Sequence, residues 1–148
     1  MRIGYAAGAF DLFHIGHLNL LRRARAGCDF LIAGVVTDEL LVGRKGREPF
    51  IPLAERLEIV GALDCVDKAV AETTDKITMC RDLGVSVLFK GDDWRGTLRG
   101  RQLEQDLRPL GVEVEYFPYT AHTSSTRLRR TLELFNAAAA PVRRAVDH

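Results

Sequence analysis

The stretch Gly8–His17, read as GAFDLFHIGH, contains two histidines three residues apart with a glycine between them. Each imidazole can donate a hydrogen bond to a phosphoryl oxygen, and each adds positive charge when it is protonated. Two such donors can stabilise the negative charge that builds up on a pentacoordinate phosphorus. We therefore expect His14 and His17 to be catalytic residues in a reaction at phosphorus.

Two other interpretations of this stretch are surface histidines at a helix start and a metal-binding pair. A helical metal pair takes i,i+4 spacing with a third ligand, and the sequence shows no such ligand, so no metal-ligating residue is predicted. Gly8 allows the backbone to pass close to a ligand, and a helix that starts near Gly16 or His17 points free N–H groups at the same place. Neither a P-loop nor a G-x-G-x-x-G fingerprint is present.

A second motif, KGDDW, spans residues 90–94 and follows a predicted strand. Aspartate oxygens can accept hydrogen bonds from the amine of a base or from a ribose hydroxyl, and a tryptophan can stack on a base or wall a pocket. The alternative is a tight turn with a core tryptophan. The position at a strand end favours a ligand site, with Asp92, Asp93 and Trp94 as its candidate residues.

A third motif, YTAHTSSTRLRR, spans residues 119–130 and opens the last predicted helix. Serine and threonine in this position are ordinary N-caps. Here three consecutive hydroxyls, the free N–H groups of the helix start and an arginine lie together, which predicts an anion site. The residues are Ser124, Ser125, Thr126 and Arg127.

The segment GRKGREPF, residues 43–50, is expected to be a connection between the second strand and the next helix, and it carries Arg44, Lys45 and Arg47. A solvated charged face is the ordinary interpretation of such a run, but this one leaves the carboxyl end of a strand beside the histidine loop. Asp38 and Arg56 are further candidates, with a turn aspartate and a salt-bridged helix arginine as their alternatives.

These motifs need a scaffold that brings them together. Apolar strand-length runs alternate with helical periods along the whole chain, which is typical of an α/β fold with a doubly wound, five-stranded parallel sheet. Ligands of such sheets bind beyond the carboxyl ends of the strands, where all the motifs lie. The predicted strands are 2–7, 29–36, 68–72, 85–90 and 112–117, and the predicted helices are 17–28, 52–63, 75–84, 100–111 and 124–135.

The composition is that of a globular protein, with 47% hydrophobic and 28% charged residues and a net charge of +1. This balance gives no reason to expect a nucleic-acid partner. The three cysteines lie far apart and predict buried thiols in a reducing compartment, without a disulfide framework or a zinc site. No targeting pattern or membrane-length apolar run is present, so we expect a cytoplasmic protein.

The motif GAFDLFHIGH resembles the signature of the cytidylyltransferase-like nucleotidyltransferase superfamily, with its Rossmann-like fold. The whole of residues 1 to about 133 is similar to the bacterial glycerol-3-phosphate cytidylyltransferases in particular. The resemblance implies a nucleotidyltransferase domain over 1–136, followed by a C-terminal extension over 137–148. It also implies a nucleotide site that includes Gly8, Ala9, Phe10, Gly16, Gly91, Asp92, Asp93, Trp94, Thr120, Ser124, Ser125, Thr126 and Arg127.

The resemblance further implies that Arg44 and Lys45 act in catalysis, and that the acceptor is bound by Asp38, Arg44, Lys45, Arg47 and Arg56. The chain departs from the family pattern at three positions: Tyr119 replaces an arginine, His122 replaces a glycine and Ala9 replaces a threonine. Either Arg127, Arg129 or another basic residue supplies the missing charge, or the triphosphate binds more weakly than in the family.

The expected reaction is transfer of CMP from CTP, with Mg²⁺ on its phosphates, to the phosphate of a small phosphorylated alcohol such as glycerol 3-phosphate, with release of pyrophosphate. A homodimer is implied by the resemblance alone. The alternatives are an adenylyltransferase of the same superfamily and a nucleotide-binding regulatory module without catalysis. A phosphonate or sugar-phosphate acceptor fits the same chemistry.

Overall fold

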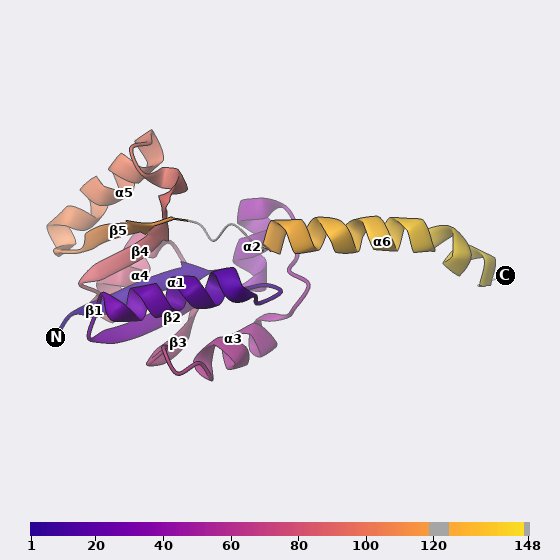
Figure 1. Cartoon of the computed structure of the whole chain (residues 1–148). Helices are drawn as coiled ribbons and strands as arrows, with labels where there is room; N and C mark the ends of the chain where they lie inside the picture. Colours follow the sequence, from indigo (N-terminus) through magenta and orange to yellow (C-terminus); the bar gives the residue numbers. More distant parts are fainter. Residues whose placement is uncertain (119–124, 147–148) are drawn as a thin grey trace.

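The computed structural model describes residues 1–118 and 125–146 and contains one parallel sheet with the strand order β3-β2-β1-β4-β5 (Figure 1). All four pairings are parallel. The order changes direction at β1, so the carboxyl ends of β1 and its neighbours β2 and β4 flank the switch point. The predicted fold class is confirmed. The strands are β1 (Ile3–Gly8), β2 (Phe30–Val36), β3 (Lys68–Glu72), β4 (Val87–Gly91) and β5 (Glu113–Phe117).

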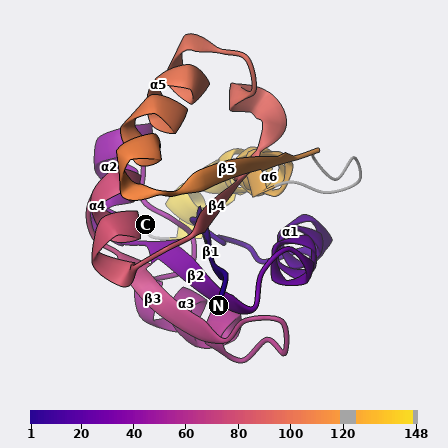
Figure 2. The same ribbon diagram turned by 90° about the vertical axis from the view of Figure 1, so that its left-hand side faces the viewer.

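Helices cover both faces of the sheet, as a doubly wound fold requires (Figure 2). One buried cluster joins the sheet to Leu21 and Ala24 of α1 and to Val60 of α3, and a second joins it to Met79 of α4 and Leu107 of α5. The helices are α1 (Ile15–Ala26), α2 (Asp38–Lys45), α3 (Leu53–Gly61), α4 (Lys76–Leu83), α5 (Leu98–Leu107) and α6 (Ser125–Val146), with single 3₁₀ turns η1 (Asp92–Trp94) and η2 (Arg108–Leu110).

The predicted connection after the second strand is partly wrong, because α2 forms there. Thr37 caps this helix by accepting a hydrogen bond from the N–H of Leu40 at 3.2 Å, and Gly46 ends it in the left-handed region at φ 73°. The helix has only eight residues, too few for its periodicity to stand out beside the charges that follow. Arg44 and Lys45 therefore lie in the last turn of a helix, and only Arg47 lies in the loop.

Helix α6 leaves the body of the domain and extends away from the sheet (Figure 1). It runs unbroken through position 136, where the sequence predicts the boundary of the extension. The helix expected from residue 124 begins at Ser125. Among residues 1–118 and 125–146, no helix has both the length and the apolar character needed to cross a bilayer.

Glycines end two helical segments, at the last positions of the predicted helices 75–84 and 100–111. Gly84 follows α4 at φ 66°, and Gly111 follows η2 at φ 73°. The expectation of buried cysteines is met by Cys80 alone, since Cys28 and Cys65 are partly exposed. All three are free thiols.

Candidate active site

The loop from β1 to α1 makes an unusually sharp turn on its way to the histidines. Phe10 and Leu12 have φ values of 51° and 52°, a left-handed backbone that non-glycine residues adopt only at a steric cost. The buried ring of Phe10 compensates by packing edge-on against the ring of His17, with centroids 5.4 Å apart. The loop thus directs the chain so that α1 begins at the carboxyl edge of the sheet.

His14 and His17 cap the start of α1 reciprocally. The Nδ1 atom of His14 accepts a hydrogen bond from the backbone N–H of Gly16 at 3.0 Å, and the Nδ1 atom of His17 accepts one from the backbone N–H of His14 at 3.3 Å. The two rings stack with centroids 3.9 Å apart. Because both Nδ1 atoms are acceptors, each neutral ring carries its proton on Nε2 and can donate it to a ligand.

The environment holds both rings neutral. Burial, with a contribution from the neighbouring His14, lowers the pKa of His17 to about 3. Burial also lowers the pKa of His14. The site therefore offers two N–H donors near neutral pH, where the sequence alone also allowed for added charge.

These rings line a cavity of about 690 Å³ at the carboxyl ends of β1, β4 and β5. The volume is within the range of small-molecule and cofactor sites. The described lining residues come from every motif of the sequence analysis, together with residues it did not single out. They are Ala7, His14, Gly16, His17, Asn19, Leu20, Arg22, Arg23, Lys45, Lys76, Phe89, Lys90, Gly91, Asp93, Phe117, Pro118 and Thr126.

Positive charge dominates this lining. Its described residues include five basic side chains and one carboxylate, that of Asp93. Burial is the main cause that lowers the pKa of both Lys45 and Lys90, and it brings that of Lys90 to about 8, so Lys90 remains largely protonated at neutral pH. A cavity with this charge and two imidazole donors is suited to polyanionic ligands.

A small pocket of about 40 Å³ adjoins the cavity and shares Lys45 and Thr126 with it. The residues that line it include Ala9, Arg47 and Arg129. The predicted candidates Ala9 and Arg47 therefore lie next to the main cavity.

Only some residues of the KGDDW motif line the cavity. Gly91 and Asp93 line the cavity, while Asp92 and Trp94 are not among its described lining residues. The Trp94 ring is occupied by cations, with Nζ of Lys90 3.7 Å and the guanidinium carbon of Arg99 4.3 Å from its centroid. Trp94 therefore holds Lys90 at the cavity, and base stacking by this ring stays a prediction.

Asp38 and Arg56 meet each other at the base of α2. Arg56 is 1% exposed, and its guanidinium donates to Asp38 at 2.5 Å and to the carbonyls of Ile51, Ala9 and Val36 at 2.7 Å each. This arginine joins the ends of β1 and β2 to α3. The structure gives both residues a supporting contact below the site, and acceptor binding by them stays a prediction.

Arg44 points to the end of β3, where its guanidinium donates to Glu72 at 2.9 Å. Lys45, the next residue, lines the cavity. Arg44 and Lys45, for which catalysis and acceptor binding are both predicted, thus lie in different surroundings, and only Lys45 is in the described lining of the cavity. Gly8 is the last residue of β1 and Phe10 lies in the loop that follows, where its ring lies about van der Waals distance from the position a Gly8 Cβ would take.

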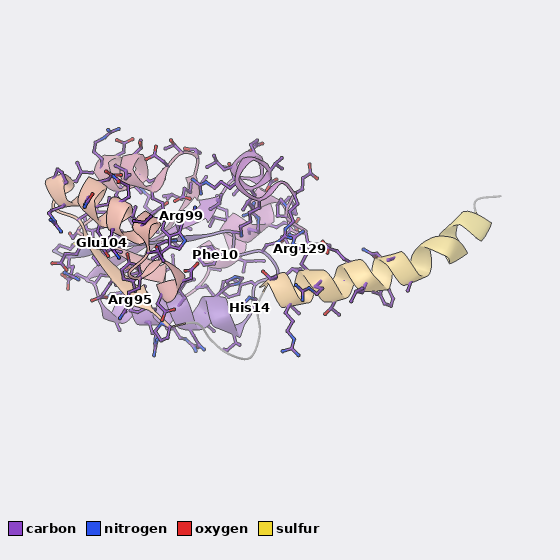
Figure 3. The ribbon with its side chains drawn as sticks, turned by 90° about the horizontal axis from the view of Figure 1, so that it is seen from above. Phe10, His14, Arg95, Arg99, Glu104 and Arg129 are labelled. Carbon is purple, nitrogen blue, oxygen red and sulfur yellow. The ribbon has the colours of Figure 1, made fainter. Side chains whose placement is uncertain are left out.

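The third motif is described only in part. Thr120 and Ser124 lie outside the described residues, as do Tyr119 and His122, and the side chain of Ser125 is not described. Thr126 lines both the cavity and the small pocket, and Arg127 lies exposed in the first turn of α6. Arg129 donates to Asp11 at 2.5 Å, which brings the start of α6 to the histidine loop (Figure 3).

Sequence reasoning missed four basic residues of the cavity, namely Arg22, Arg23, Lys76 and Lys90. A helical pattern could have found one of them, because Gly16, Leu20 and Arg23 recur at i, i+4 and i+7 and so share a face of α1. Lys90 is the first residue of the KGDDW motif, of which only the four later residues are candidates in the sequence analysis. Lys76 has no comparable local signal.

The fold and the cavity define an α/β protein with a cationic cavity at the switch point of a parallel sheet. The chain belongs to the cytidylyltransferase-like family, because the sequence model of that family matches residues 5–131. This confirms the predicted resemblance. Named relatives include cytidylyltransferases, so the predicted transferase class agrees with the class of the relatives.

Glycerol-3-phosphate cytidylyltransferase from Bacillus spizizenii is 32% identical over 84% of this chain and 92% of its own length. FAD synthase from Pyrococcus abyssi is 34% identical over 86% of this chain and 90% of its own length. Bifunctional protein HldE from Geobacter sulfurreducens is 33% identical over 86% of this chain, but the chain spans only 26% of that protein. The lipopolysaccharide core biosynthesis protein from Thermoplasma volcanium has the same fold, with a TM-score of 0.69, 22% identity and coverage of 83% of this chain and 99% of its own.

Proposed function

We propose that this protein is a nucleotidyltransferase that transfers CMP from CTP to the phosphate of a small phosphorylated alcohol and releases pyrophosphate. The observation that carries the proposal is the reciprocal cap of His14 and His17, which fixes both rings beside a cationic cavity with Nδ1 as the acceptor and Nε2 as the donor. The similarity to a protein named glycerol-3-phosphate cytidylyltransferase, over most of both chains, supports CTP and this class of acceptor.

The nucleotide enters as its Mg²⁺ complex, so the metal is part of the substrate. Magnesium prefers phosphate oxygens together with few protein carboxylates, and the described lining of the cavity contains only one, Asp93. Thr126 and the start of α6 are proposed to bind the β- and γ-phosphates. Lys90, fixed over the Trp94 ring, contributes charge on the side of β4.

The acceptor is proposed to bind on the side of β2 and β3. Lys45 from the end of α2 and Lys76 from the start of α4 line the cavity there, and Arg47 lies in the adjoining pocket. Cations on this side reduce the repulsion between the acceptor phosphate and the triphosphate. They also hold the acceptor phosphate in a fixed orientation relative to the triphosphate, which lowers the entropic part of the activation barrier.

The reaction needs no covalent intermediate with the protein. An oxygen of the ionised acceptor phosphate attacks the α-phosphorus of CTP and forms a new P–O bond, while the bond from the α-phosphorus to pyrophosphate breaks in line with it. The Nε2–H groups of His14 and His17 donate to the equatorial oxygens as their charge increases. No proton has to be taken from the acceptor.

The test is a pyrophosphate-release assay with Mg·CTP or Mg·ATP and a panel of acceptors. The panel contains glycerol 3-phosphate, ethanolamine phosphate, sugar phosphates and phosphonates. We expect turnover with CTP and a phosphate monoester, and a loss of turnover in His14→Asn. Arg81→Gln is the matched control, since Arg81 is exposed on α4 and pairs only with Asp82 among the described contacts.

Other outcomes of this assay identify the alternatives. Turnover with ATP alone would assign the protein to the adenylyltransferases, an outcome kept in the test because one relative is named for a product that contains adenosine. CTP binding without turnover on any acceptor would indicate a regulatory module. The homodimer and the cytoplasmic location remain predictions.

A further inference from the structure

A fully buried carboxylate lies at the carboxyl end of β3. The side chain of Glu72 is 0% exposed and has three charged or polar partners. Its Oε1 atom accepts a hydrogen bond from the Tyr5 hydroxyl at 2.8 Å, and its Oε2 atom accepts from Arg44 at 2.9 Å and from Lys76 at 3.3 Å. The two cations come from α2 and α4, the helices that flank β3 at this end.

Tyr5 reaches Glu72 across an intervening strand. It belongs to β1, which pairs with β2, and β2 in turn pairs with β3. The tyrosine passes over Gly34 of β2, where an added Cβ would lie 2.0 Å from the hydroxyl oxygen. The absence of a side chain at position 34 is therefore what allows Tyr5 to bind Glu72.

The result is a carboxylate that cannot move. Burial of Tyr5 and the adjacent charge of Glu72 raise the pKa of the tyrosine, so its hydroxyl keeps its proton and remains a donor. A buried charge needs such partners, since an isolated one is strongly disfavoured. Glu72 is thus a carboxylate with a fixed position, with which flexible cationic side chains can form ion pairs.

Of the two cations paired with Glu72, Lys76 is the one that lines the cavity. Its side chain is 21% exposed, and it lines the cavity while its Nζ pairs with Glu72. Arg44 supports the same arrangement from the other side, because its guanidinium also donates to the carbonyl of Thr74 at 3.2 Å, in the turn that leads into α4. Two cations share one carboxylate, so the cluster keeps a net positive charge that faces an incoming anion.

We propose that Glu72, held by Tyr5, is a positioning residue that orients Lys76 for the acceptor phosphate. This inference rests on the proposed function of the cavity. A free lysine samples many rotamers and loses this freedom when it binds an anion. The ion pair to Glu72 already restricts the rotamers of Lys76 before the acceptor arrives, so less conformational entropy is lost on binding. It therefore favours binding of the acceptor and leaves binding of CTP unchanged.

The experiment compares Glu72→Gln, Tyr5→Phe and wild type in the pyrophosphate-release assay, with separate KM values for CTP and for glycerol 3-phosphate. Calorimetric titration with glycerol 3-phosphate and with Mg·CTP measures binding without turnover. We expect Glu72→Gln to weaken acceptor binding about tenfold while CTP binding stays within about twofold. Tyr5→Phe, which keeps the carboxylate and both ion pairs, is expected to show the same selectivity with a smaller loss.

Asp67→Asn is the matched control. Asp67 accepts a hydrogen bond from the backbone N–H of Leu31 at 2.8 Å and, like Glu72, pairs with an arginine, but it precedes β3 at the end of the sheet opposite the cavity. A purely structural role for Glu72 predicts that Glu72→Gln and Asp67→Asn lower the unfolding temperature without a selective effect on the acceptor. That outcome, or equal losses for CTP and acceptor, overturns the inference.

A double-mutant cycle tests whether Glu72 acts through Lys76. Lys76→Gln is combined with Glu72→Gln, and also with Tyr5→Phe in case the first pair fails to fold. If Lys76 carries the effect, the second substitution adds little to the acceptor loss already caused by Lys76→Gln. Additive losses contradict the proposal.

The proposed function fails separately from this inference. A wild-type protein that binds Mg·CTP but no phosphate monoester refutes the acceptor side, and this inference with it. A wild-type protein that turns over CTP with glycerol 3-phosphate, while Glu72→Gln keeps the same acceptor KM, refutes this inference alone.

Discussion

Arg129, in the first turns of α6, forms an ion pair of 2.5 Å with Asp11, in the loop that precedes the histidines. The pair is largely buried, with 12% and 5% of the two side chains exposed. Asp11 also accepts the backbone N–H groups of Phe50 and Ile51, both at 2.9 Å. One carboxylate therefore joins the histidine loop, the segment before α3 and the helix that carries Thr126.

Replacing this carboxylate is expected to destabilise the protein. Asp11→Asn keeps the shape but removes the charge opposite Arg129 and turns one acceptor into a donor, at a cost of about 2–4 kcal/mol. Urea unfolding at 25 °C measures the loss. Glu113→Gln, which breaks an exposed ion pair to Arg2, is the control and should change stability by less than about 1 kcal/mol. Equal effects of the two variants would contradict the role given to Asp11.

His14→Asn separates the two functions of His14. Asparagine is a good N-cap and can still accept the N–H of Gly16, but it lacks a donor at the position of Nε2. We expect turnover to fall about 100-fold with little change in stability. His14→Ala should show the same loss of turnover together with about 1 kcal/mol of lost stability. Full activity of His14→Asn would remove the donor role.

The lowered pKa of His17 predicts how the free energy of unfolding depends on pH. Its pKa is about 3 in the folded protein, mainly because of burial, and about 6.5 in an unfolded chain. Between these values the unfolded state binds more protons, so stability rises with pH from about 3 to 6.5 and falls on acidification, by at most about 1.4 kcal/mol per pH unit. His17→Gln should show a shallower decline between pH 7.5 and 5 in urea unfolding. An identical slope would show that the ring titrates normally in the fold.

Arg56→Lys tests the junction below the site. A single ammonium group cannot replace a guanidinium that contacts three carbonyls and Asp38, so buried acceptors lose their donors. We expect a loss of about 3–5 kcal/mol in urea unfolding. Arg25→Lys, at a partly exposed pair with Asp67, should cost far less. If Arg56→Lys is stable and affects only acceptor KM, Arg56 is a ligand-binding residue rather than a structural one.

The fold was accessible from the sequence because the signals that define it are local. Alternation of buried strands with amphipathic helices predicts the doubly wound sheet, and the predicted helices 75–84 and 100–111 close at glycines that cap helical segments in the structure. The histidine motif lies at a strand–helix boundary, so its place at the carboxyl edge follows from the topology alone.

Long-range partners were not accessible in the same way. The contact between Tyr5 and Glu72 depends on strand order and on the bare backbone of Gly34 between them, neither of which is a local pattern. Arg56 could equally be an exposed helix residue, and only the packing of three elements shows that it is buried. Lys76 was missed because a lone lysine at a helix start has many uses.

The left-handed residues Phe10 and Leu12 have a consequence for how this chain can vary. Their steric cost, of order 1–3 kcal/mol each, is offset by neighbours that hold the same loop, including the Arg56 bond to Ala9 and the Asp11 bonds to Phe50 and Ile51. A substitution that removes one of these neighbours lets the turn relax before the sheet melts. Substitutions that accumulate around this loop should therefore abolish the activity before they prevent folding, and the result would be a folded but inactive domain.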